Sequence, residues 1–186
     1  MLNLTHRRNV TCLPEPLRFA QSGVTLIELM ITIVIVSILL TVALPNFGAW
    51  IQNTQIRTAT ESIQNGLQLA RAEAVRRNEP VDFILGAGTS WSVSTAAGTP
   101  IQSRAGGEGS VNVTVTVDPL GATTATFNAL GRLTNPAAAP TQIDLDVPTS
   151  ILAASQSKEL RINISSGGQI RSCDPNIVAA GDPRKC

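Results

Sequence analysis

The stretch "SGVTLIELM", residues 22–30, decides how the rest of the chain is interpreted. It opens an apolar run, residues 24–44, in which Glu28 is the single charged side chain. The other polar members of the run carry hydroxyl groups: Thr25, Thr32, Ser37 and Thr41. A charge at the centre of a membrane helix costs about 2.5 to 3.5 kcal/mol. A carboxylate in such a run therefore needs a partner or a function.

The apolar run is long enough to cross a membrane as a helix. Its twenty-one residues, at a rise of 1.5 Å each, make a helix of roughly 31 Å, which matches the hydrocarbon thickness of a bilayer. Three arginines precede the run, whereas the first basic residue after it is Arg57. The positive-inside rule therefore predicts a single-pass protein with a cytoplasmic N-terminus, in which everything after Pro45 is exported.

Glu28 has two interpretations. In the first, its carboxylate lies near the cytoplasmic end of the helix and snorkels to the headgroups. In the second, the chain is cut between Gly23 and Val24, which frees an α-amine one helical turn from Glu28. The new cation and the carboxylate then pair within one subunit or between neighbours, and this interpretation is favoured.

An ordinary secretory signal, removed after Ala43, is the alternative for the whole run. The apolar region of such a signal is about 7 to 15 residues long. Residues 24–44 exceed that length and contain a glutamate. The sequence therefore favours a retained apolar helix.

The longer stretch "SGVTLIELMITIVIVSILLTVALPNF" resembles the class III signal of type IV pilins and of the pseudopilins of type II secretion. Shared features are a glycine before the cut, a glutamate at the fifth position after it and a proline near the end, here Pro45. The resemblance implies cleavage after Gly23 by a prepilin peptidase, N-methylation of Val24 and packing of the helix into a filament core. Glu28 would then accept the amine of an adjoining subunit. Val24 departs from the commoner phenylalanine, and the leader, residues 1–23, is long.

A second apolar pattern extends the helix beyond the membrane run. Residues at spacings of three and four form one apolar stripe: Ile56, Ala59, Ile63, Leu67, Ala70 and Ala74. Such a stripe predicts an amphipathic helix that covers an apolar surface, and Pro80 ends the pattern. We expect one helix of about fifty residues, interrupted or kinked around Pro45 and Gly48.

Short β-type segments follow the helix and predict the surface that it covers. They read "VDFIL", "WSVST", "VNVTVTV", "ATFNA", "QIDLDV" and "LRINIS". Gly, Pro, Ser and Ala clusters separate them, and residues 96–110 and 133–142 are expected to be loops. The predicted fold is α+β: one long N-terminal helix packed on an antiparallel sheet.

The β-rich part also resembles the GspH/FimT branch of the pilin family. The stretches that carry the resemblance are "QLARAEAVRRNEPV", "FNALGR" and "LRINISSGGQIRSC". They resemble the helix exit, the mid-sheet turn and the closing hairpin of that branch. Minor pilins of this branch initiate or cap filaments, and some are implicated in DNA uptake during natural transformation.

Charge and cysteine content narrow the function further. Removal of three arginines and one glutamate with the leader leaves eleven basic and twelve acidic side chains, which argues against bulk attraction to nucleic acid. Cys12 lies in the leader, so Cys173 and Cys186 are the cysteines of the exported part. An even pair in an oxidising compartment predicts a disulfide, with two free thiols as the alternative.

The sequence offers little to an enzyme. The only histidine, His6, lies in the leader, and the chain contains no tyrosine. Asp144 and Asp146 alternate on a predicted strand, which is typical of a solvated face rather than a catalytic pair. We expect no catalysis, no cofactor and no metal.

DNA binding is the alternative function. Arg171, Arg184 and Lys185 lie around the disulfide-closed tail, and Arg161 lies on the preceding strand. Together they could present cations to phosphates. The DNA-binding members of the branch carry a G-R-x-R type element before the first tail cysteine, and here only Arg171 carries over. The opposing interpretation is that these charges keep the tail soluble.

The sequence therefore predicts a pilin-like filament subunit in three parts: a leader at 1–23, a transmembrane and filament-core helix at 24–44, and a periplasmic domain at 45–186. The implied partners are other pilin or pseudopilin subunits, a prepilin peptidase, the inner-membrane assembly platform and the membrane itself. A type IV pilus and a type II secretion filament both remain open.

Overall fold

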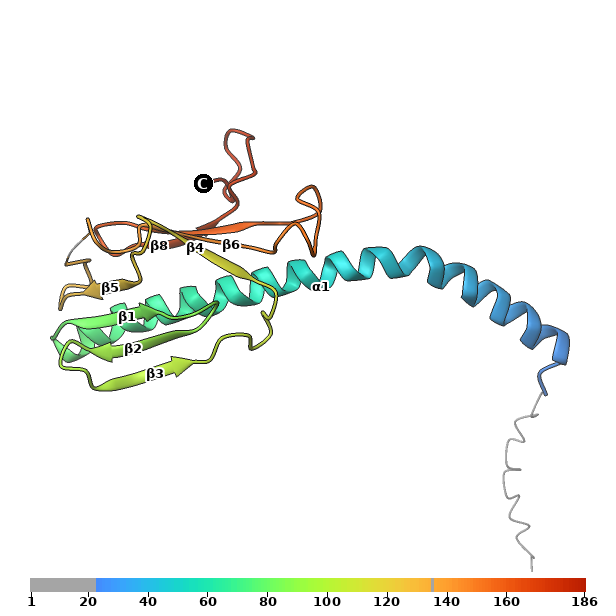
Figure 1. Cartoon of the computed structure of the whole chain (residues 1–186), viewed down its shortest axis with the longest axis horizontal. Coiled ribbons are helices and arrows are strands. Elements are labelled where there is room, and N and C mark those ends of the chain that lie inside the picture. The colour runs from blue at the N-terminus through green and yellow to red at the C-terminus, as the bar shows by residue number, and fades with distance from the viewer. Residues whose placement is uncertain (1–22, 135) are drawn as a thin grey trace, which may run out of the picture. The chain divides into compact units, whose positions relative to one another are not determined.

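The computed structural model describes residues 23–134 and 136–186, with the side chains of residues 42–46 outside that description. The predicted leader therefore lies almost wholly outside the described residues. The chain divides into two units, Met1–Thr41 and Val42–Cys186, and each is considered by itself. All the strands found among the described residues lie in the second unit (Figure 1).

Helix α1, Leu26–Arg77, supplies the described helical residues of both units. In the first unit it begins directly after Thr25, whose hydroxyl accepts a hydrogen bond from the Glu28 N–H at 3.2 Å. The hydroxyls of Thr32, Ser37 and Thr41 donate to carbonyls of the preceding turn at 2.7 to 2.8 Å. These bonds satisfy the hydroxyl donors within the helix, as an apolar environment requires.

The predicted membrane segment, residues 24–44, extends into the part without described side chains. Among the described residues, no helix combines the length and the apolar character needed to span a membrane.

α1 runs without a break across positions 45 and 48, so the helix is not interrupted there. A kink, the other form of that expectation, stays a prediction. The helix ends at Arg77, and Asn78 follows with φ of 57°, the left-handed conformation that often terminates a helix. Pro80 comes two residues later, as expected of a residue that cannot continue a helix.

The strands form two sheets rather than the single sheet that the sequence suggested, and every strand pair is antiparallel. The first sheet has the order β3-β2-β1-β5, with β1 at Val81–Leu85, β2 at Trp91–Thr95, β3 at Pro100–Arg104 and β5 at Thr124–Phe127. The second has the order β4-β6-β7-β8, with β4 at Thr114–Asp118, β6 at Gln142–Asp146, β7 at Leu160–Ile164 and β8 at Ile170–Cys173. The predicted α+β class is confirmed.

Two local expectations were wrong. β3 lies within residues 96–110, which were expected to be a loop. It is an edge strand whose residues are mostly exposed, so its sequence lacks the apolar alternation that would have indicated a strand. The strand expected from residue 111 begins only at Thr114. Asn112 instead bonds the helix, with its backbone N–H on the Gln55 side chain and its amide on Gln52.

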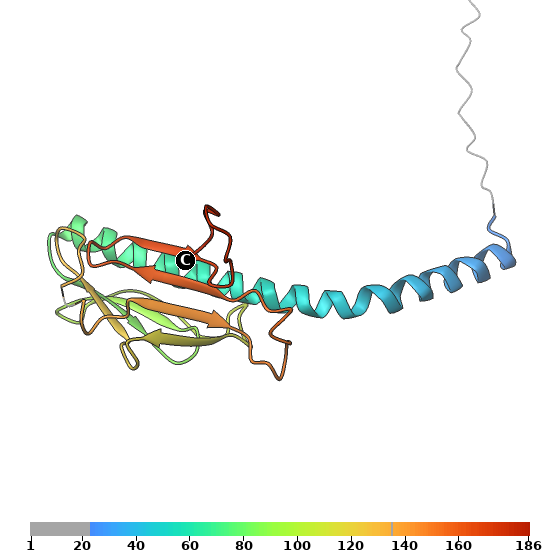
Figure 2. The ribbon, with the colours of Figure 1, turned by 90° about the horizontal axis from the view of Figure 1, so that it is seen from above.

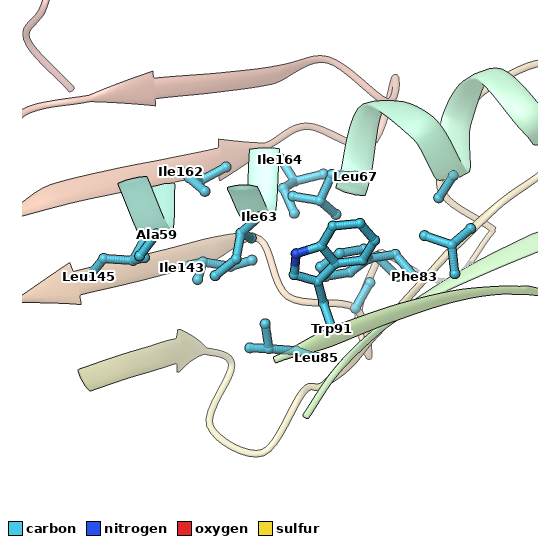
Figure 3. Packing of buried hydrophobic residues seen from close by; sticks show 14 of the residues in the cluster. Ala59, Ile63, Leu67, Phe83, Leu85, Trp91, Ile143, Leu145, Ile162 and Ile164 are labelled. Atoms are coloured by element: carbon cyan, nitrogen blue, oxygen red, sulfur yellow. The ribbon is translucent and has the colours of Figure 1, made fainter. Parts of the chain in front are cut away.

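Buried side chains from α1 and from both sheets form one core (Figure 3). Every member of the predicted helix stripe is at most 1% exposed: Ile56, Ala59, Ile63, Leu67, Ala70 and Ala74. Figures 1 and 2 show the part of α1 that belongs to the second unit running alongside the strands of both sheets. Both sheets therefore pack in one core that contains this apolar stripe of α1.

One glycine lets the first sheet approach the helix closely. A Cβ at Gly66 of α1 would lie 2.9 Å from ring atoms of both Phe83 and Trp91. Without it, the two rings pack against the helix backbone with their centroids 6.0 Å apart. The Trp91 indole N–H donates to the Ser62 hydroxyl at 2.9 Å, which satisfies the one polar atom of that ring.

Two turns also meet at the end of the helix. Gly131 follows β5, Gly168 joins β7 to β8, and a Cβ at Gly168 would overlap the Gly131 carbonyl oxygen. The same carbonyl accepts a hydrogen bond from Arg71 Nε at 3.2 Å. The helix and turns from both sheets are thus joined at one point.

Gly168→Ala tests this junction. The new methyl group would strike the Gly131 carbonyl and would also require φ of 78° from an alanine, so we expect the free energy of unfolding to fall by about 3 kcal/mol. Urea unfolding of the full chain in detergent, followed by circular dichroism, measures the change. Gly167→Ala is the matched control, because its Cβ meets nothing closer than the Ser165 hydroxyl at 3.7 Å. Equal stability of the two variants would contradict the proposed clash.

Candidate functional site

The predicted processing site lies at the beginning of α1. Gly23 and Val24 are exposed and precede the helix, and no described atom lies within 4 Å of the Cβ position of Gly23. Glu28 lies in the first helical turn. Thr25 and Glu28 have the spacing of a capping box, in which the first side chain bonds the N–H of the fourth residue.

This position gives Glu28 an electrostatic role even before any cut. The N-terminus of a helix carries roughly half a positive charge, and a carboxylate in the first turn is stabilised there. A cut before Val24 would add a full positive charge two residues before the helix begins. The carboxylate would then face two sources of positive potential at the same helix end.

Cys173 and Cys186 form a disulfide with a Cα–Cα distance of 5.1 Å, so the predicted bridge is present. Cys173 closes β8 and is 2% exposed. Two Arg171 hydrogen bonds also hold the tail, one to the Pro183 carbonyl at 2.6 Å and one to the Lys185 carbonyl at 3.1 Å. The Asp174 N–H donates to the Arg184 carbonyl at 2.7 Å.

The four cations predicted for DNA binding all have partners inside the chain. Arg161 pairs with Asp144 across β7 and β6, at 2.5 and 2.9 Å. Arg184 pairs with Asp182 at 2.8 Å, and Lys185 Nζ donates to the Val178 carbonyl at 3.2 Å. Arg171 bonds tail carbonyls, so Arg171, Arg184 and Lys185 stabilise the tail. Arg161 instead joins two strands of the second sheet.

The two aspartates of β6 are not a purely solvated pair. Asp144 pairs with Arg161, and Asp146 accepts hydrogen bonds from the Val147 N–H and the Ser157 hydroxyl. Glu159 lies near both, and its pKa is raised by burial and further by the negative charges of Asp144 and Asp146. Within residues 23–134 and 136–186, no group of three or more His, Cys, Asp or Glu side chains could hold a metal ion.

Sequence reasoning missed two features of the second unit. Arg71 joins the helix to the Gly131 turn, and a stacked pair, Phe47 and Trp50, lies exposed on α1. The pattern of apolar spacing could not indicate Arg71, because its partner is a backbone carbonyl sixty positions away. The aromatic pair was visible as two large residues at helical spacing outside the stripe.

Two protein-family descriptions match parts of this chain. Residues 59–168, more than half of the chain, match the family described as Type II transport protein GspH. Residues 18–44 match the prokaryotic N-terminal methylation motif. No curated protein sequence matches the chain.

Two crystal structures of the type IV minor pilin FimU from Pseudomonas aeruginosa (strain PAO1) are similar to this chain. The first has a TM-score of 0.50 and 20% sequence identity, and covers 67% of this chain and 97% of the FimU chain. The second has a TM-score of 0.48 and 22% identity, and covers 62% and 86%. At 20% identity, the likeness to the first structure shows the fold alone, which is that of a pilin.

Helix, sheets and N-terminal motif together define a pilin-like protein. The family match is equally direct: the chain belongs to the GspH family. The resemblance drawn from the sequence is thereby confirmed.

The disulfide should contribute measurably to stability. A bridge between Cys173 and Cys186 closes a loop with a sequence separation of 13. Because a loop of this size restricts the unfolded chain, replacing both residues by serine should lower the free energy of unfolding by about 3 kcal/mol. Urea unfolding of the full chain measures the loss. Cys12→Ser is the control and should change nothing, and a double variant as stable as the native chain would show that the bridge is not formed.

The Asp182–Arg184 pair gives a local test of the tail geometry. Hydrogen bonds from the Arg184 side chain and backbone lower the pKa of Asp182 to about 2. Since the folded pKa lies below the unfolded one, the pair stabilises the tail at neutral pH, and that contribution is lost as the pH falls toward 2. Arg184→Ala should raise the pKa of Asp182 toward the ordinary value of about 3.9. A carboxyl ¹³C titration measures it, with Arg132→Ala as control; an unchanged pKa would place Arg184 away from Asp182.

Proposed function

We propose that the chain is a minor pilin or pseudopilin, a structural subunit of a type IV pilus or of a type II secretion filament that assists filament assembly and protein secretion. The observation that carries this proposal is the start of α1. It falls within the match to the N-terminal methylation motif, and it places Glu28 in a capped first turn.

Processing is the first step of the proposed function. A prepilin peptidase cuts between Gly23 and Val24 and the new amine of Val24 is methylated. The exposure of both residues, ahead of the helix, is consistent with access by a peptidase. No catalytic group or cofactor of this chain takes part.

Glu28 then sets the register between neighbouring subunits in the filament. The α-amine of Val24 adds positive charge to a helix end that is already positive. Glu28 of the same subunit or of an adjoining one accepts this amine, since an opposite charge within hydrogen-bonding distance stabilises both. In an apolar filament core, only the register that brings the two charges together avoids an unpaired ion.

Before assembly, we propose that residues 24–44 hold the subunit in the inner membrane, with a cytoplasmic N-terminus and residues 45–186 in the periplasm. The apolar composition and the upstream arginines support this topology. The inner-membrane assembly platform then transfers the subunit to the filament, where other pilin subunits replace the lipid around the helix.

DNA uptake is the alternative function. It requires phosphates to compete with the internal partners of Arg161, Arg171, Arg184 and Lys185. Each phosphate contact would have to displace or share one of these partners, and that competition weakens the contact. Filament assembly is therefore the function that the structure supports better.

Glu28→Ala tests the registry role. Cleavage and methylation should proceed, so intact-mass analysis should show a chain that begins at methylated Val24. Incorporation into filaments should fall by about tenfold or more, because an unpaired amine in an apolar core costs at least the 1.4 kcal/mol that corresponds to tenfold. Quantitative immunoblotting of sheared filaments measures incorporation.

Thr32→Ala is the matched control, since the Thr32 hydroxyl bonds the Leu29 carbonyl of its own helix at 2.8 Å and carries no charge. It should assemble normally. Normal assembly of Glu28→Ala would contradict the pairing, and a native chain that begins at Leu44 would contradict pilin-type processing.

A further inference from the structure

An exposed apolar cluster lies at the beginning of the second unit. Phe47, Trp50 and Ile51 are 56%, 62% and 37% exposed. The Phe47 and Trp50 rings are stacked, with centroids 5.6 Å apart and planes at 26°. The other tryptophan of the chain, Trp91, is 5% exposed and hydrogen bonded to Ser62.

The cluster lies on the face of α1 that points away from the core. At 100° per residue, Phe47, Trp50 and Ile51 lie opposite Ala49 and Ile56, which pack against or belong to the core. The core-facing side is also occupied by Asn53, whose side chain bonds the backbone of Gln156 at 2.9 Å and of Lys158 at 2.7 Å. The core-facing side of this helical segment is therefore packed against the domain. No part of the chain that the structure describes covers the aromatic side.

The sequence around the cluster points to one kind of partner. No charged residue occurs from Leu29 to Ile56, so the charge-free interval of the apolar run continues through the cluster. Phe47 and Trp50 follow Leu44, the last residue of that run, by three and six positions, which is about 5 and 9 Å along a helix. Aromatic side chains with uncharged polar neighbours directly after an apolar segment are typical of the headgroup layer of a bilayer.

We propose that Phe47, Trp50 and Ile51 lie in the headgroup layer of the periplasmic leaflet while the subunit is in the membrane. This inference rests on the proposed membrane segment at 24–44. The cluster fixes how deep the periplasmic domain sits on the bilayer, because moving it outward exposes the rings to water and moving it inward buries the polar residues that follow. Release of this contact is then a step in transfer of the subunit to the filament.

Tryptophan fluorescence tests the proposal, because the chain has only two tryptophans and they lie in different environments. The full chain is reconstituted into phosphatidylcholine and phosphatidylglycerol vesicles. Trp91→Phe leaves Trp50 as the single reporter, and Trp50→Phe leaves Trp91. If Trp91→Phe does not fold, the difference between the native chain and Trp50→Phe gives the emission of Trp50.

We expect Trp50 emission to shift to the blue in vesicles. It should be quenched about twofold more by lipids brominated beside the headgroup than by lipids brominated at the chain ends, because aromatic belts lie at headgroup level. Trp91 should respond to neither. As a positional control, a tryptophan placed by Leu120→Trp, at a site 95% exposed in the turn after β4, should remain unquenched.

Vesicle flotation separates this proposal from the function on which it rests. A chain that floats with vesicles while Trp50 remains unquenched would overturn the headgroup contact and leave the membrane segment intact. A blue shift that rises with protein density but ignores brominated lipid would assign the cluster to a second copy of the chain and also overturn the proposal. A chain that does not float would overturn both.

Discussion

The apolar stripe of α1 is the constraint on which the domain depends. Six residues at helical spacing are almost fully buried, and their neighbours in the core come from both sheets. Each four-stranded sheet has one face to bury, and an antiparallel sheet of this size needs a packing partner to be stable. One helix face provides that partner for both. Gly66 allows Phe83 and Trp91 of the first sheet to approach the helix closely, and Arg71 bonds the turn after β5.

The sequence predicted those parts of the fold in which periodicity reports burial. The helix stripe recurs at three and four, and β6 and β7 alternate apolar with polar residues. β1 and β2 are short runs rich in apolar and hydroxyl residues, so their positions were predictable as well. β3 was not, because an exposed edge strand buries too few residues to leave a pattern. The division into two sheets was also not predictable. It depends on which strands pair at long range, as β5 does with β1 rather than with its neighbour β4.

Among the candidate site residues, too, some features were predictable from the sequence and others were not. The disulfide was predictable because two cysteines in a domain that the sequence predicts to be exported are expected to pair. The state of the cations was not, since Arg161 meets an aspartate seventeen positions away and Arg171 meets carbonyls twelve and fourteen positions away. A basic residue in a tail looks available for a phosphate until the fold supplies its acceptor. Here the fold supplies one for each of the four predicted cations.

The charge pattern along α1 links these observations to a filament role. Glu28 and Arg57 bound an interval without any charge, and the chemistry within it changes in order: a capped first turn, apolar residues whose interspersed hydroxyls bond their own helix, then a stacked aromatic pair. A helix that only covered a sheet would need none of this order, because its outer face would tolerate charge. Under the proposed function, this segment leaves lipid and enters a protein core, and so encounters two apolar environments in turn. It would therefore benefit from having one charge only, placed at the end where the proposed cut would create the opposite charge.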